Sequence, residues 1–128
     1  MEEGELRVTK KCLSLKFGFT AAATATTKQG GTDDERYSQM LADCKLGYDL
    51  GYDCAWVLEH HFTDYFPTPS PTVVMSHLAA AFPGLSLGSC VLVLPWYNPL
   101  RLAEEISMLS HFCKGDLHLA FGRGTAKI

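Results

Sequence analysis

The sequence Trp56-Val-Leu-Glu-His-His-Phe62 joins an apolar run to a carboxylate, two adjacent imidazoles and a phenyl ring. The apolar run predicts a buried strand, and the polar residues mark the point where that strand gives way to a loop. Polar side chains held at the end of a buried strand are typical of the edge of an active site. The neighbouring segments should therefore supply the scaffold and the other walls of that site.

Three further segments are predicted to be strands. Residues 13–19 alternate apolar side chains with polar or small ones, which is the period-two signal of a strand. Residues 85–94 are almost continuously apolar, as expected for a strand that is covered on both faces. Residues 117–121 alternate again and lead into Gly122-Arg-Gly124. With the segment that ends near Glu59, the sequence predicts four strands.

Three helices are predicted between these strands. The first begins at Thr32, which has the capping-box spacing to Glu35, and ends at Gly51. Ser70-Pro71 and Asn98-Pro99 each place a capping residue before a proline and so predict the starts of the other two. The spacing of apolar residues predicts the side chains that face the core. They are Tyr37, Met40, Leu41, Cys44 and Tyr48 in the first helix, Val73, Val74, His77, Leu78 and Ala81 in the second, and Ala103, Ile106, Leu109, Phe112 and Cys113 in the third.

The alternation of strands and helices predicts an α/β fold with a parallel sheet and right-handed crossovers. A doubly wound sheet would favour a glycine-rich phosphate turn after the first strand, and no G-x-G-x-x-G occurs there. A TIM-type barrel of ~250 residues has eight strands, and the repeat here is about 32 residues. We therefore predict a solvated extension over residues 1–11 and the first four β/α units of a barrel, a half-barrel, over residues 12–128.

Composition limits the possible functions. The 128 residues are 47% hydrophobic and 20% charged, which is typical of one globular domain. The net charge of -3 and the absence of a basic run disfavour nucleic acid. Five widely spaced cysteines without a C-x-x-C favour a reducing compartment over a disulfide framework or a zinc site. The charged N-terminus and the lack of an apolar stretch of ~20 residues predict a cytoplasmic protein without a membrane span.

Residue chemistry alone suggests two functional groups. His60 and His61 are neighbours on an extended segment, so their side chains should point to opposite faces and cannot readily bind one metal ion together. One of them can face a cavity and exchange protons near neutral pH, or both can simply hydrogen-bond to backbone. Arg123 lies between two glycines, where its guanidinium can either bind a phosphate or remain in water.

A set of short motifs gives the chain a specific resemblance. In order and spacing it resembles the bacterial luciferase-like, flavin-dependent monooxygenases, over roughly residues 16–124. The Glu-His-His-Phe run, combined with the later Leu-Pro, Asn-Pro and Arg-x-Ala-Glu-Glu pieces, is the most specific part. The motifs are Lys16-Phe-Gly-Phe19, Gly51-Tyr-Asp53, Trp56-Val-Leu-Glu-His-His-Phe62, Leu87-Gly88, Val93-Leu-Pro95, Asn98-Pro99, Arg101, Ala103-Glu-Glu105 and Gly122-Arg-Gly124.

The resemblance implies a barrel that binds reduced flavin mononucleotide (FMN) at the carboxyl ends of its strands. Family members use O2 to oxidise small organic substrates such as aldehydes, ketones, alkanes or sulfonates, and a separate reductase usually supplies the reduced flavin. They form homo- or heterodimers, and we expect the same here. Three alternatives stay open: a deazaflavin-dependent oxidoreductase, a non-catalytic subunit of a dimer, and an inactive truncated relic that acts only in assembly.

The resemblance also implies roles for individual residues. His60 would be the catalytic histidine facing the cavity. Cofactor binding would fall to Arg123 at the flavin phosphate, to Cys90 and Val91 beneath the flavin ring, and to Glu59. The peptide bond between Cys90 and Val91 can be cis in the family, and we expect a cis bond here only in a complete barrel. His61 would be structural and would approach Glu104 of a partner subunit. No metal site is expected.

Overall fold

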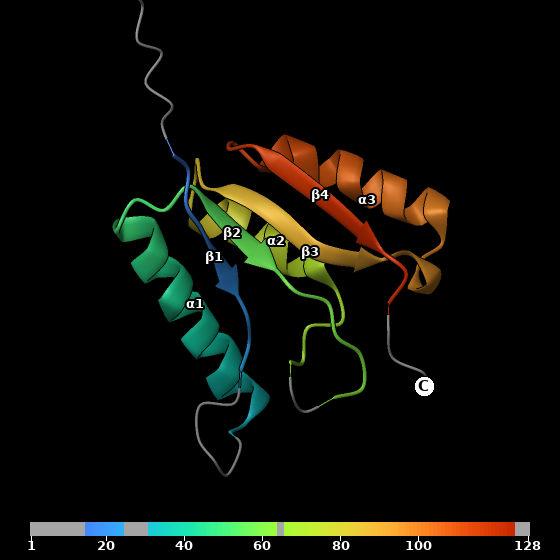
Figure 1. Ribbon diagram of the computed structural model, residues 1–128, viewed down its shortest axis with the longest axis horizontal. Helices are drawn as coiled ribbons and strands as arrows, with labels where there is room; N and C mark the ends of the chain where they lie inside the picture. Colours follow the sequence, from blue (N-terminus) through green and yellow to red (C-terminus); the bar gives the residue numbers. More distant parts are fainter. Residues whose placement is uncertain (1–14, 25–30, 64–65, 125–128) are drawn as a thin grey trace, which may run out of the picture.

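The computed structural model describes residues 15–24, 31–63 and 66–124. The extension predicted over residues 1–11 therefore lies outside the described residues. All paired strands are parallel, in the order β1-β2-β3-β4, and the predicted alternation of strands and helices is confirmed (Figure 1). The elements are β1 (Gly18–Ala21), α1 (Asp33–Asp49), β2 (Cys54–Val57), α2 (Pro71–Ala81), β3 (Ser86–Val93), the 3-10 turn η1 (Leu94–Trp96), α3 (Pro99–Phe112) and β4 (Leu117–Gly122).

Capping residues fix the helix ends much as the sequence predicts. The Thr32 hydroxyl accepts a hydrogen bond from the Glu35 N–H at 3.3 Å, and the Glu35 carboxylate accepts one from the Thr32 N–H at 2.8 Å. Gly51 follows α1 with φ +80°, a conformation that the absence of a Cβ permits. Asn98 caps α3 through its side chain. Ser70 stands at the N-cap of α2 but makes no side-chain cap bond.

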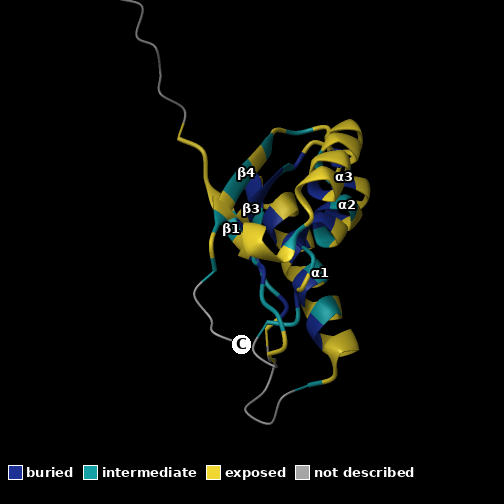
Figure 2. Ribbon diagram, turned by 90° about the vertical axis from the view of Figure 1, so that its right-hand side faces the viewer, coloured by how far each residue is buried: buried dark blue, intermediate teal, exposed yellow. Residues whose placement is uncertain are grey.

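The hydrophobic core lies between the helices and one face of the sheet. Figure 2 shows the three helices on the same side of the strands. Met75, Leu78, Leu87 and Leu109 are the largest apolar side chains at its centre, each at most 1% exposed. Because the helices cover one face, the opposite face of the sheet is available to form the interior of a barrel.

The buried face of α2 differs from the prediction. Val73 is 67% exposed, whereas Met75 and Ala79 are buried. His77 and Ala81, which were also expected in the core, are exposed. The helix carries apolar residues around nearly its whole circumference, so their spacing could not identify the buried side.

The predicted face of α3 is correct only in part. Leu109 and Cys113 are buried as expected. Leu102 is buried in place of Ala103, and Phe112 is 51% exposed. The apolar stripe of this helix is therefore rotated by about one position at its N-terminal end.

Trp56 lies on the sheet face opposite the helices. A Cβ added to Gly88 would meet the indole ring at 2.4 Å, and one added to Gly18 would meet it at 2.5 Å. The His118 ring stacks on the indole with centroids 5.7 Å apart. Glycines in the two flanking strands thus make room for the indole across the middle of the sheet.

Substituting Gly88 by alanine should lower the free energy of unfolding by about 1–3 kcal/mol, because the new methyl group overlaps the Trp56 ring. Urea unfolding followed by circular dichroism measures the change. The same substitution in a Trp56→Ala background should cost clearly less. An equal cost in both backgrounds would show that the indole is not the cause.

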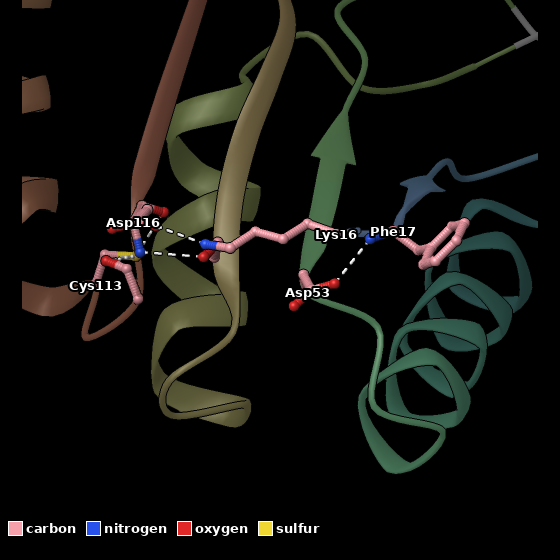
Figure 3. Close-up of polar contacts among 7 residues, drawn as sticks. Lys16, Phe17, Asp53, Cys113 and Asp116 are labelled. Atoms are coloured by element: carbon pink, nitrogen blue, oxygen red, sulfur yellow. Dashed lines mark hydrogen bonds and ion pairs between the residues drawn. The ribbon is translucent and has the colours of Figure 1, made fainter. Parts of the chain in front are cut away.

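The amino-terminal edge of the sheet carries a polar cluster. The Phe17 N–H donates to Asp53 Oδ2 at 2.7 Å, and β1 starts only at Gly18, later than the alternation over residues 13–19 predicts. Lys16 Nζ lies 3.5 Å from Asp116 Oδ2, and Figure 3 shows the lysine extending towards it. Both side chains are about two-thirds exposed, so this pair contributes ~0–1 kcal/mol.

β1 and β4 are the edge strands of the sheet in this part of the chain. No helix in the described ranges has the length and apolar character needed to cross a membrane.

Candidate functional site

A cavity of about 500 Å³ opens at the carboxyl ends of the strands. Its walls come from the segments that follow β2, from the second half of β3 with the η1 turn, and from the end of β4. In parallel β/α folds this edge holds the functional residues. All five residues that the sequence assigns to a site line this one cavity: Glu59, His60, Cys90, Val91 and Arg123.

A second cavity, of about 550 Å³, lies at the opposite edge of the sheet and includes Lys16, Asp53 and Asp116. Its volume is similar, so volume does not decide between the two. The carboxyl edge holds both imidazoles and the Arg123 guanidinium, whereas the other edge holds the exposed ion pair described above. The side chains present therefore favour the cavity at the carboxyl edge as the functional site.

His60 lies in the loop after β2. Its backbone N–H donates to the Thr68 carbonyl at 3.0 Å, which ties the loop to the start of α2. Its ring is half-buried and lies 5.1 Å from the Phe66 ring. The imidazole is thus held at the cavity wall, where it can exchange a proton with a bound molecule.

Glu59 makes three contacts with protein groups. Its Oε2 accepts hydrogen bonds from the Val93 N–H at 2.9 Å and from the Tyr97 hydroxyl at 2.8 Å. Its Oε1 lies 2.7 Å from Nε2 of His61, and its side chain is 0% exposed. Burial and the hydrogen bond to Glu59 raise the pKa of Tyr97 well above its usual value. The carboxylate lines the cavity, but both its oxygens are already engaged.

His61 packs within the chain. Its ring stacks on the Trp96 indole, with centroids 4.8 Å apart and planes 27° apart. Glu104, the residue expected near it across a dimer, instead lies 3.7 Å from Arg101 on α3. The structural role of His61 fits these contacts, and the contact across a dimer stays a prediction.

The remaining two walls are formed by β3 and β4. The Cys90–Val91 peptide bond is cis. From the sequence we expect this bond only in a complete barrel, whereas it occurs here in four β/α units. A Cβ at Gly122 would lie 2.6 Å from Val91, and one at Gly124 would lie 2.8 Å from Val93. The glycines on either side of the exposed Arg123 therefore let the end of β4 approach β3 closely.

Three contributors to the site were not predicted from the sequence: the Val93 N–H, the Tyr97 hydroxyl as a partner of Glu59, and the support of Trp96 by His61. For the contacts of Tyr97 and Trp96, the only signal in the sequence was that these two aromatic residues stand side by side after β3. Among the described residues, no group of three or more His, Cys, Asp or Glu side chains could hold a metal ion.

The sequence matches a known family. The family described as luciferase-like monooxygenase matches residues 15–128, and the chain belongs to it. The alkanal monooxygenase alpha chain of Photorhabdus luminescens is 34% identical over 80 residues, which are 62% of this chain and 22% of that protein. A luciferase-like monooxygenase of Escherichia coli K12 is 30% identical over 105 residues, which are 82% of this chain and 31% of that protein. The chain thus spans about a fifth to a third of the curated relatives it matches.

Solved structures confirm the predicted fold, the first four β/α units of a TIM-type barrel. Monooxygenase RslO1 from Streptomyces bottropensis has a TM-score of 0.77 at 24% identity, over 87% of this chain and 34% of that one. The oxygenating constituent of 3,6-diketocamphane monooxygenase from Pseudomonas putida, a type II Baeyer-Villiger enzyme in complex with FMN, has a TM-score of 0.79 at 18% identity. That match covers 89% of this chain and 31% of the other.

Proposed function

We propose that this chain forms a flavin site of a luciferase-like monooxygenase, which uses reduced FMN and O2 to oxidise a small organic substrate such as an aldehyde, ketone, alkane or sulfonate. The observation that carries the proposal is the convergence of His60, the Cys90–Val91 step and Arg123 on one cavity. They come from the loop after β2, from the second half of β3 and from the segment just after β4.

The residues present fit a flavin. The cavity of about 500 Å³ lies in the size range of small-molecule sites, ~300–1,000 Å³. Its wall combines apolar side chains, including Val91 and Trp96, with one exposed guanidinium. The glycines around Arg123 leave the guanidinium uncrowded, so it can form paired hydrogen bonds with a phosphate.

Each of these residues has a separate role in the proposal. Arg123 would bind the flavin phosphate, and the Cys90–Val91 backbone would lie beneath the ring. His60 would hold or donate a proton at its imidazole beside the reacting atoms. Reduced flavin, when bound, would supply the electrons for the reaction with O2. A separate reductase, a dimeric state and a cytoplasmic location belong to the same proposal.

Anaerobic titration of the chain with reduced FMN tests binding, followed by flavin fluorescence and by isothermal calorimetry. Admitting O2 with a long-chain aldehyde then tests turnover through product formation. A reduced deazaflavin in place of FMN tests the alternative cofactor. Binding without turnover would favour the non-catalytic subunit, and the absence of binding to either flavin would overturn the proposal.

Substituting Arg123 by alanine should weaken reduced FMN binding about 10- to 100-fold, because a hydrogen bond to a charged group contributes ~1.5–3 kcal/mol. Binding of riboflavin, which has no phosphate, should change little. Arg101→Ala is the matched control, since Arg101 is an exposed arginine on α3. Equal losses for FMN and riboflavin would contradict a phosphate contact.

The cysteines offer an independent probe of the cavity. Cys90 is exposed and lines it, whereas Cys44 and Cys54 are buried. Burial raises the pKa of both buried thiols to about 11, so at pH 8 they are almost entirely in the unreactive thiol form. Iodoacetamide should therefore label Cys90 faster than either, and saturating FMN should slow that labelling, as measured by peptide mass mapping. Labelling of Cys90 at the same rate with and without FMN would place the flavin elsewhere.

A further inference from the structure

The buried carboxylate of Glu59 anchors the aromatic part of the cavity wall. Its two oxygens meet three groups: the Val93 N–H, the Tyr97 hydroxyl and Nε2 of His61. A buried charge is costly unless several donors compensate it, and here each oxygen has at least one partner. A residue engaged in this way has little capacity left for a ligand.

Two of these contacts hold the ends of one short turn. Val93 is the last residue of β3 and Tyr97 follows η1, so the carboxylate binds the backbone before Trp96 and the side chain after it. The third contact orients the His61 ring, on which the Trp96 indole stacks at 4.8 Å. Trp96 is therefore fixed from both sides along the chain and from beneath its ring.

We propose that Glu59 is a positioning residue and not a ligand of the cofactor: it fixes the His61 ring and the η1 turn, and thereby sets the Trp96 indole as the wall against which an apolar substrate packs. Trp96 remains 48% exposed and lines the cavity, so part of the indole is available to a ligand. The role of Trp96 towards a substrate rests on the proposed function, whereas the positioning of His61 and Trp96 by Glu59 does not.

The proposal determines the protonation of His61. An ionised carboxylate can only accept hydrogen bonds, so Nε2 of His61 must carry a proton. In a Glu59→Gln variant, the amide oxygen can keep the Val93 and Tyr97 donors. The amide NH2 then faces His61, and Nε2 must become the acceptor, which moves the ring proton to Nδ1.

Nitrogen-15 NMR of the imidazole rings in the ligand-free chain tests this directly, at about pH 8.5, well above the ordinary imidazole pKa of ~6.5. The wild-type spectrum should show the protonated-type shift at Nε2 of His61, and Glu59→Gln should move it to Nδ1. Glu105→Gln is the matched control, because Glu105 bonds to Thr72 on α2 and should leave His61 unchanged. A wild-type His61 protonated at Nδ1, or one that Glu59→Gln does not alter, would overturn the proposal.

The indole resonances report the second half of the proposal. In Glu59→Ala the Trp96 N–H resonance should shift towards that of an exposed indole, while the Trp56 resonance serves as an internal reference. If the Glu59→Ala chain does not fold, Tyr97→Phe serves as the second variant. It removes one donor only and should keep His61 protonated at Nε2. An unmoved Trp96 resonance in a folded Glu59→Ala chain would contradict the role of Glu59.

Substrate binding separates this inference from the proposed function. In a chain that turns over aldehyde, Trp96→Ala should raise KM several-fold with little change in kcat. Reduced FMN affinity should not change in Glu59→Gln, because Glu59 does not contact the cofactor. A loss of FMN affinity in that variant would refute the positioning role, whereas failure of the wild-type chain to bind FMN would refute only the proposed function.

Discussion

Substituting His60 by asparagine is expected to lower the rate of substrate oxidation about 10²- to 10⁴-fold, the usual contribution of a general acid or base. Asparagine keeps a polar side chain of similar size but cannot exchange a proton near neutral pH. The imidazole lines the cavity next to Phe66, and its backbone is held by Thr68, so the substitution should leave the loop in place. Product formation under saturating reduced FMN and aldehyde measures the effect.

The control for His60 is His111→Asn, because His111 is exposed in the last turn of α3, away from the cavity. This variant should retain the wild-type rate. FMN affinity of the His60 variant should stay within about threefold of the wild-type value, since binding and proton transfer are separate roles. If His60→Asn turned over at the wild-type rate, a different group would have to carry the proton.

Substituting Leu87 by alanine should lower the free energy of unfolding by about 2–5 kcal/mol, which is the range for truncating a buried leucine. Leu87 lies in β3, one of the two middle strands of the sheet, and is 0% exposed within the core. Since a whole domain is stable by only ~5–15 kcal/mol, this loss is a large share of the total stability. Urea denaturation at several protein concentrations measures the change.

Leu100→Ala provides the comparison for Leu87, because Leu100 is 77% exposed at the start of α3. That substitution should change stability by less than about 0.5 kcal/mol. A small effect at Leu87 would mean that the core relaxes around the deleted atoms or that the strand is packed differently.

The sequence predicted the fold well wherever the signal is local. The capping box at Thr32 and the proline after Asn98 each depend on residues a few positions apart, and both helix starts are correct. The sequence also accounts for the convergence of His60 and Arg123 on one cavity. Each follows a predicted strand, and parallel strands bring their carboxyl ends to the same edge of the sheet.

Features that depend on distant residues could not be predicted. The contacts of Glu59 are an example, because its partners Val93 and Tyr97 lie 34 and 38 residues further along the chain and no local pattern connects them to it. The buried side of α2 was misassigned for a related reason: only the neighbouring strand and helix decide which of its many apolar side chains is covered. Local pattern identifies the element, whereas tertiary packing selects the face.

The position of β4 at the edge of the sheet has a consequence for deuterium uptake. In an edge strand, alternate amides point away from the neighbouring strand and lack its protection. The amides of β4 that face β3 should therefore exchange slowly, and those between them should exchange at rates close to those of an unstructured peptide. Any strand that pairs with this edge would slow only the second set, so the exchange pattern of these six residues would record the addition of the next β/α unit.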